Sequence, residues 1–204
     1  SHGTNITQLT QSFLPNQITL SGLLEVDAQA SGNKKSIDQA SLKTSVTQGK
    51  LNYQDQSTKY FSPIKQAKFN STYHSKQLES TIQLTLEPKN IIQTNFTIKD
   101  FSHLSWPNLN QPIEGSLKIQ ANNLQSYSPF LPNIDLKKGS IESSLTISGP
   151  LESANITGQS SLKNIKVFLP KIGLSISNMN FSLFNQGHTT KYTGTMLSNK
   201  TSLN

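Results

Sequence analysis

Apolar side chains recur at every second position through long stretches of this chain. Near the C-terminal end they fall on Ile141, Leu145, Ile147, Ile156 and Leu162, and glycine or proline interrupts the pattern about every ten residues. Such alternation is typical of antiparallel strands that have one dry face and one wet face. The dry faces must pack against apolar groups, which belong either to the protein's own hydrophobic core or to a bound apolar ligand.

The same pattern predicts strands along nearly the whole chain. The runs cover residues 18–28, 40–49, 51–53, 67–73, 78–86, 90–98 and 113–119, and at least four more follow, the last containing Tyr192 and Met196. Because no helical pattern of ten residues intervenes, we expect an antiparallel meander of about a dozen strands, each of about eight to twelve residues. A parallel β-helix is the main competing architecture, but the chain shows no repeat of about twenty residues.

Two segments, 101–112 and 122–135, break the alternation. They carry three prolines between Trp106 and Pro129, and their apolar residues Leu124, Tyr127 and Leu131 are three and four positions apart. This spacing predicts short helical turns.

The composition favours an open or elongated shape. Only 33% of the residues are apolar and 7% aromatic, which is little for the interior of a globular domain. A closed β-sandwich would bury the same alternating residues, however, so the alternation alone leaves both arrangements open.

The charged residues indicate no nucleic-acid site and no catalytic or metal site. The net charge is +7, but every basic residue is a lysine and the lysines are spread along the chain. The chain has no cysteine, and its histidines His2, His74, His103 and His188 lie far apart without a second ligand at metal-binding spacing. We therefore expect a protein that is not an enzyme and that holds no metal or cofactor.

The chain also lacks a run of eighteen apolar residues that could span a membrane as a helix. We expect residues 1–204 to form a single groove domain that is a fragment of a larger protein. Residues 1–3 resemble a tag or vector remnant.

Several segments in the C-terminal half resemble the repeating module of the TamB family, which belongs to the AsmA-like (DUF490) group of envelope proteins. The segments are Ile113-Glu-Gly-Ser-Leu-Lys-Ile, Gly139-Ser-Ile-Glu-Ser-Ser-Leu-Thr-Ile-Ser-Gly, Ile156-Thr-Gly, Leu169-Pro-Lys-Ile-Gly-Leu and Phe181-Ser-Leu-Phe-Asn-Gln-Gly. The order of these segments carries the resemblance, which covers residues 110–200 well and residues 17–100 only as generic strands. It implies a central-to-C-terminal periplasmic fragment of such a protein.

The resemblance implies an all-β fold, an elongated antiparallel sheet folded over like a taco shell (a β-taco) with an apolar concave interior. It further implies a Gram-negative periplasmic protein, anchored in the inner membrane, that conducts phospholipid between the two membranes and partners an Omp85-type, TamA-like outer-membrane barrel. The residues expected to line the lipid groove are Leu84, Phe96, Ile98, Leu117, Ile119, Leu145, Ile147, Leu162, Leu169, Ile176, Phe181 and Met196.

An alternative function within the same family uses the sheet edges rather than the groove. A chaperone or scaffold of the translocation and assembly module would take up strands of outer-membrane or autotransporter clients by β-augmentation. The sequence does not decide between the two, because alternation describes the faces of a sheet and not its edges.

Overall fold

The computed structural model describes residues 4–5, 18–33, 36–55, 58–86, 90–101, 108–131, 133–187 and 189–200 of the chain. Most of these residues lie in strands. The strands are β1 (Thr4–Asn5), β2 (Ile18–Asn33), β3 (Ser36–Asp55), β4 (Thr58–His74), β5 (Gln77–Leu86), β6 (Asn90–Ile98), β7 (Pro112–Ala121), β8 (Asp135–Pro150), β9 (Asn155–Leu169), β10 (Leu174–Gln186) and β11 (Thr189–Lys200). Three 3-10 helices join them within the described residues, η1 (Leu124–Phe130), η2 (Leu151–Ser153) and η3 (Pro170–Ile172).

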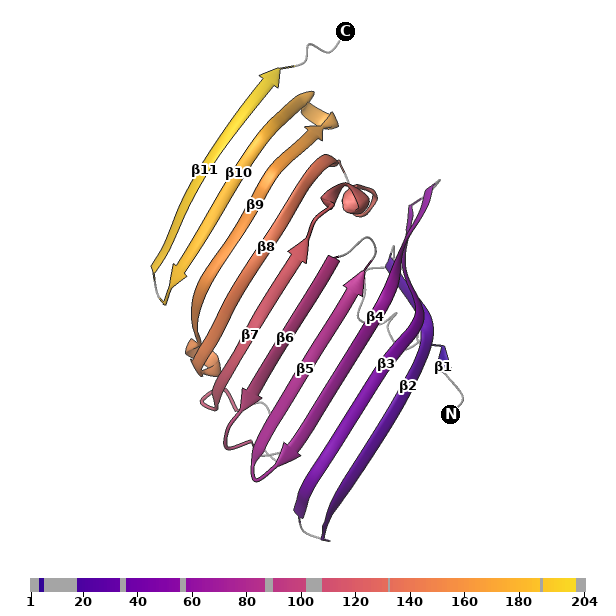
Figure 1. Ribbon diagram of the computed structural model, residues 1–204, viewed down its shortest axis with the longest axis vertical. Coiled ribbons are helices and arrows are strands. Elements are labelled where there is room, and N and C mark those ends of the chain that lie inside the picture. The colour runs from indigo at the N-terminus through magenta and orange to yellow at the C-terminus, as the bar shows by residue number, and fades with distance from the viewer. Residues whose placement is uncertain are drawn as a thin grey trace.

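The strands form one sheet in which each strand pairs antiparallel with its neighbours in the sequence, in the order β1 to β11. Figure 1 shows them side by side in a single twisted layer, with the ends of β2 to β4 bending away from the line of the other strands. The predicted all-β antiparallel meander is therefore confirmed, and the competing parallel β-helix is not the fold.

The sheet is open, and no second sheet of described residues covers it. The accessible surface is 13826 Å², whereas a compact monomer of 22.5 kDa exposes about 9,500 Å². No large side chain in the described part of the chain falls below 2% exposure. A closed sandwich would show the opposite on both counts, so the open arrangement is the correct one.

A line of β-bulges crosses the sheet near one end of its long strands. One extra residue interrupts the pairing in β3, β4, β8, β9 and β10, and Gln48, Asn164 and Asn178 have left-handed φ angles of 52°, 54° and 53° at these places. The extra residue keeps apolar side chains on one face where the sequence changes parity, as from Leu162 to Val167. Because a bulge bends and twists its strand, these five strands bend at a common level.

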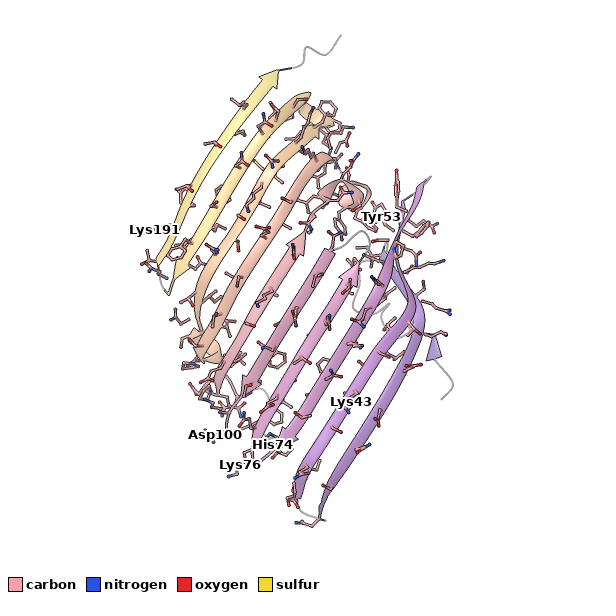
Figure 2. All side chains as sticks on the ribbon, in the orientation of Figure 1. Lys43, Tyr53, His74, Lys76, Asp100 and Lys191 are labelled. Atoms are coloured by element: carbon pink, nitrogen blue, oxygen red, sulfur yellow. The ribbon has the colours of Figure 1, made fainter. Side chains whose placement is uncertain are left out.

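Helix η1 fills the space beyond the ends of β5, β6 and β7, which stop at the level of the bulges while β3, β4 and β8 continue. The ring of Phe130 contacts that of Tyr53 edge-on, with 5.9 Å between centroids, and the side chain of Tyr53 lies beside η1 in Figure 2. Ile64, Leu86 and Ala121 are buried at this end of the sheet.

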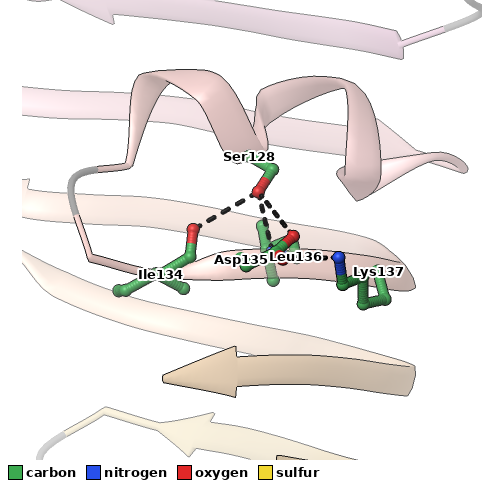
Figure 3. Close-up of polar contacts among 5 residues, drawn as sticks. All are labelled: Ser128, Ile134, Asp135, Leu136 and Lys137. Atoms are coloured by element: carbon green, nitrogen blue, oxygen red, sulfur yellow. Dashed lines mark hydrogen bonds and ion pairs between the residues drawn. The ribbon is translucent and has the colours of Figure 1, made fainter. Parts of the chain in front are cut away.

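The Ser128 hydroxyl fastens η1 to the start of β8, as Figure 3 shows. It accepts a hydrogen bond from the backbone N–H of Leu136 at 2.8 Å, and the Ile134 carbonyl lies 3.3 Å away as an acceptor. Asp135, which also lies within reach of this hydroxyl, forms an ion pair with Lys137. These contacts fix the angle at which the chain leaves η1 and enters the sheet.

At the opposite end of the sheet lie residues 99–101 and 108–111, the described parts of the connection between β6 and β7. The Phe101 ring contacts that of Tyr73 edge-on at 5.9 Å, and the Gln111 side-chain amide donates a hydrogen bond to the Asp100 carbonyl at 2.7 Å. At this end Ile98 is only 2% exposed, the lowest value among the apolar core residues of the described chain.

The structure corrects several boundaries. The strands range up to 20 residues, so they are longer than expected. Gly49 does not end a strand but sits beside a bulge within β3. The helical turn predicted within 122–135 is confirmed as η1, whereas η2 and η3 were not anticipated. Of the segment 101–112, residues 102–107 lie outside the described residues, and residues 108–111 form a turn.

Candidate functional site

The pairing registers divide the side chains of the sheet into two chemically different faces. One face, here called the apolar face, includes a row of directly opposed residues that crosses seven strands. The row is Val26, Thr44, Phe69, Ile82, Thr94, Leu117 and Leu145. The opposite face, here called the polar face, carries mainly Ser, Thr, Asn, Gln, Lys and Glu. This division follows from the two-residue period of a strand.

All twelve residues predicted to line a groove lie on the apolar face. The pairing of directly opposed residues places them there, for example Phe96 opposite Gly115, Leu145 opposite Leu117, and Phe181 opposite Leu162. Ile98 is buried and Met196 is 57% exposed, while the other ten are half-buried. The structure thus brings the twelve together as one surface, and whether that surface holds lipid stays a prediction.

The prediction missed other members of the apolar face. These are chiefly Val26, Phe69, Ile82, Ile92, Ile113, Ile156, Leu183 and Tyr192, which pair across the same rows. The alternation of these residues is visible in the sequence. However, knowing which residues of one strand share a face does not tell which residues of the next strand lie on that face. Only the pairing register supplies that link.

Several polar groups on the apolar face are hydrogen-bonded within the protein, although the buried Ser62 hydroxyl is not. The hydroxyls of Ser71 and Ser80 lie 2.9 Å apart, and those of Ser143 and Ser160 lie 2.7 Å apart. The Thr94 hydroxyl donates to the Ser116 carbonyl at 2.8 Å. A hydroxyl that already has a partner costs little when an apolar molecule displaces its water. The face is therefore more apolar in its behaviour than its residue types suggest.

Two cavities open on the apolar face. One of about 200 Å³ lies over β6 to β9, and one of about 430 Å³ lies over β2 to β5. The first is lined mainly by Phe96, Ile113, Leu117, Leu145, Ile147 and Ile156, and the second by Ala28, Ala30, Leu42, Phe69, Tyr73 and Leu78. Neither holds a charged side chain, so both suit an apolar ligand.

Asn90 holds η1 against the sheet. It is 3% exposed, it donates from Nδ2 to the Tyr127 hydroxyl at 2.6 Å, and its Oδ1 accepts from the Asn122 backbone N–H at 3.1 Å. Burial raises the pKa of Tyr127 above its usual value, and the Asn90 hydrogen bond lowers it by less. The folded state therefore favours the neutral phenol.

This pKa shift predicts a loss of stability in alkali. The pKa of Tyr127 is higher in the folded state than in the unfolded state. Its contribution to the free energy of unfolding is therefore complete below about pH 10 and is lost as the pH rises through the folded-state pKa. We expect the Tm of the wild type to fall over that window more steeply than the Tm of Tyr127→Phe, which keeps the ring and loses the titration. Thermal unfolding at a series of pH values measures this. Parallel Tm curves for the two proteins would contradict it.

The described residues offer no centre for metal-dependent chemistry and no membrane-spanning helix. No group of three or more His, Asp or Glu side chains in these parts of the chain could hold a metal ion. None of the helices described is long and apolar enough to cross a bilayer. The apolar face is therefore the candidate site that the geometry supports best.

A model of a known protein family matches most of the chain. The family is described as TamB, N-terminal domain, and the match covers residues 3–162. The chain belongs to the TamB family. TamB-family proteins are envelope-associated, periplasmic transport and assembly components, part of the translocation and assembly module, and are not a known enzyme family. No curated protein and no solved structure matched the chain.

The match extends the resemblance along the chain. The resemblance was expected to be clear over residues 110–200 and only generic over residues 17–100, whereas the family model, described as the N-terminal domain, covers β1 to β8 in full. The C-terminal segments are the more conspicuous in the sequence because their glycines punctuate short apolar runs. The long strands β2 to β4 carry the same pattern with bulges instead of turns, which obscures it.

Proposed function

We propose that the apolar face binds the acyl chains of phospholipid and conducts them along the sheet. The observation that carries this proposal is a continuous apolar face, crossing ten strands, that η1 and Phe101 contact only near its two ends and that no second sheet of described residues covers. Each methylene transferred from water to such a face contributes about 0.8 kcal/mol, so binding needs an apolar wall rather than a specific polar pocket.

The exposure of this face supports a bound apolar ligand. Val26, Ile82, Ile156, Tyr192 and Met196 all lie on it and are between 38% and 73% exposed. Soluble monomers rarely expose a contiguous apolar surface larger than a few hundred Å². Acyl chains lying along the rows of the sheet would remove this surface from water.

The packing at the two ends of the strands supports movement of the acyl chains from strand to strand. Helix η1 with Asn90 occupies one end, and the β6–β7 connection with Phe101 occupies the other. An acyl chain between these two ends would be free to move from one strand to the next, but not along the length of a strand. The route would therefore run in the direction in which strands are added to the sheet.

The proposal extends to partners and location as the family implies them. In the whole protein, the groove would lead from an inner-membrane anchor toward a TamA-like outer-membrane partner of the Omp85 type. These 204 residues would then form one section of a longer apolar route. The sheet order also places β11 at an edge, where the described residues leave it without an outer partner strand, and this favours β-augmentation of outer-membrane clients as a second candidate function.

Photo-crosslinking from the two faces of one strand tests the lipid proposal. A photoreactive amino acid at Ile82 places the probe in the central row of the apolar face, and the same amino acid at Gln83 places it on the opposite face of β5. We expect phospholipid adducts from position 82 and few from position 83, read by mass spectrometry of the intact protein expressed in Gram-negative cells. Equal yields from both positions, or no adduct at all, would contradict the proposal.

A further inference from the structure

The polar face holds a second, chemically different cavity. Its volume is about 690 Å³, and it opens over β6 to β10 on the side away from the proposed lipid route. The polar-face side chains that line it are Gln93, Lys118, Gln120, Glu142, Ser144, Gln159, Ser161, Lys163 and Ser182, together with the apolar Ile91 and Phe184.

The polar side chains of this cavity are mostly free to bind. Glu142 and Lys163 form an ion pair at 2.6 Å, but the amides of Gln93, Gln120 and Gln159 and the hydroxyls of Ser144, Ser161 and Ser182 have no side-chain hydrogen bond to another described residue. This is the reverse of the apolar face, where hydroxyls such as those of Ser143 and Ser160 satisfy each other. A surface of unpaired amides and hydroxyls suits a ligand that itself carries many donors and acceptors.

The cavity also contains two exposed apolar side chains. Phe184 is 43% exposed and Ile91 is 36% exposed, although both lie on the polar face. Phe184 pairs with Gln159 on β9 and with Lys191 on β11, so its ring is surrounded by polar neighbours; the side chain of Lys191 lies near the turn into β11 in Figure 2. A flat ring among amides and hydroxyls matches a ligand with an apolar face and a polar rim.

One straight row of directly opposed polar-face residues runs through the cavity, perpendicular to the strands. The directly opposed residues are Lys68, Gln83, Gln93, Lys118, Ser144, Gln159, Phe184 and Lys191, one from each strand from β4 to β11. Neighbouring strands are about 4.8 Å apart, so Gln93 and Phe184 are separated by about 19 Å. Lys118 lies between them and makes no ion pair with another described residue. The row therefore fits an extended ligand whose negative group lies about 14 Å, or three strand spacings, from the part that contacts Phe184.

We propose that this cavity binds a linear acidic oligosaccharide. The C–H face of a sugar ring would lie on Phe184, its hydroxyl and acetamido groups would exchange hydrogen bonds with the glutamine and serine side chains, and a carboxylate would reach Lys118. The proposal does not depend on lipid transport, because it uses the opposite face of the same strands. Only one aromatic ring contributes, so the expected affinity is weak.

Saturation-transfer NMR with two sugars of equal length tests the proposal. The acidic probe is the hyaluronan tetrasaccharide, which alternates glucuronate with N-acetylglucosamine, and the neutral probe is the N-acetylglucosamine tetramer. We expect saturation transfer to both probes, with tighter binding of the acidic one. Phe184→Ala should weaken the binding of both about fivefold or more, and Lys118→Gln should remove the preference for the acidic sugar.

Two variants on the same face serve as matched controls. Phe61 is also an exposed phenylalanine on the polar face, at 64%, and Lys43 is an exposed lysine there (Figure 2), but neither lines the cavity. Phe61→Ala and Lys43→Gln should leave sugar binding unchanged. The proposal is overturned if the wild type shows no transfer, if the control variants weaken binding as much as the cavity variants, or if anionic phospholipid vesicles displace the sugar through Lys118, which would identify a headgroup site instead.

Discussion

Leu145→Asp is expected to remove bound phospholipid from the protein. Leu145 lies in the central row of the apolar face and lines its 200 Å³ cavity. A carboxylate in contact with an acyl chain costs several kcal/mol unless it is paired, and each 1.4 kcal/mol is a factor of ten in affinity. We therefore expect the lipid extracted per mole of purified protein to fall at least about tenfold, as measured by mass spectrometry of the organic extract.

Ser144→Asp is the matched control for this change. Ser144 is the preceding residue of β8, it is exposed, it lies on the polar face, and it does not line that cavity. The two variants add the same charge to the same strand, so a common loss of lipid would point to damage of the sheet rather than of the route. If Leu145→Asp keeps its lipid while circular dichroism shows an intact sheet, lipid conduction along this face is wrong. Client assembly through the β11 edge would then become the better candidate function.

Gly158→Ala is expected to destabilise the sheet strongly. Gly158 has a φ of +125°, and a Cβ at this position would lie 2.2 Å from the Ser144 carbonyl oxygen of the neighbouring strand. Backbone strain and overpacking each cost about 1–3 kcal/mol, so we expect a loss of about 4 kcal/mol. In a chain of this length the Tm should fall by about 10 °C, measured by differential scanning calorimetry.

Gly149→Ala separates the two causes. Gly149 also has a positive φ, +102°, but a Cβ at this position would have the Asn155 nitrogen, 4.0 Å away, as its nearest neighbour. This variant should therefore show only the conformational cost, about 1–2 kcal/mol. Equal losses for the two glycines would mean that the close approach of β8 to β9 at Gly158 does not limit stability.

The sequence was sufficient to predict the architecture because alternation is a local property of each strand. The strand runs around Leu84, Phe96 and Leu117 needed no knowledge of their partners, and their consecutive pairing follows from short polar turns. Helix η1 was predictable for a similar reason, since the prolines and the spacing of Leu124 and Tyr127 oppose a strand. These features depend on residues close together in the chain.

The features that were not predicted depend on residues far apart. The long strand β3 was divided at Gly49 because nothing local distinguishes a bulge from a turn. Phe69 and Ile82 were not assigned to the proposed groove because their face is set by pairing with neighbouring strands. The cavity beside Phe184 combines five strands, and no segment of the sequence alone could indicate it.

The shared bulge line makes the two surfaces of the sheet interdependent. Asn164 in β9 and Asn178 in β10 are the extra residues of their bulges. Without the extra residue, every side chain beyond the bulge in that strand would move to the opposite face of the sheet. A family member that lost only one of these insertions would present lysines where its neighbours present leucines. Selection should therefore gain or lose such insertions in adjacent strands together, which gives homologous sequences a recognisable co-ordinated spacing.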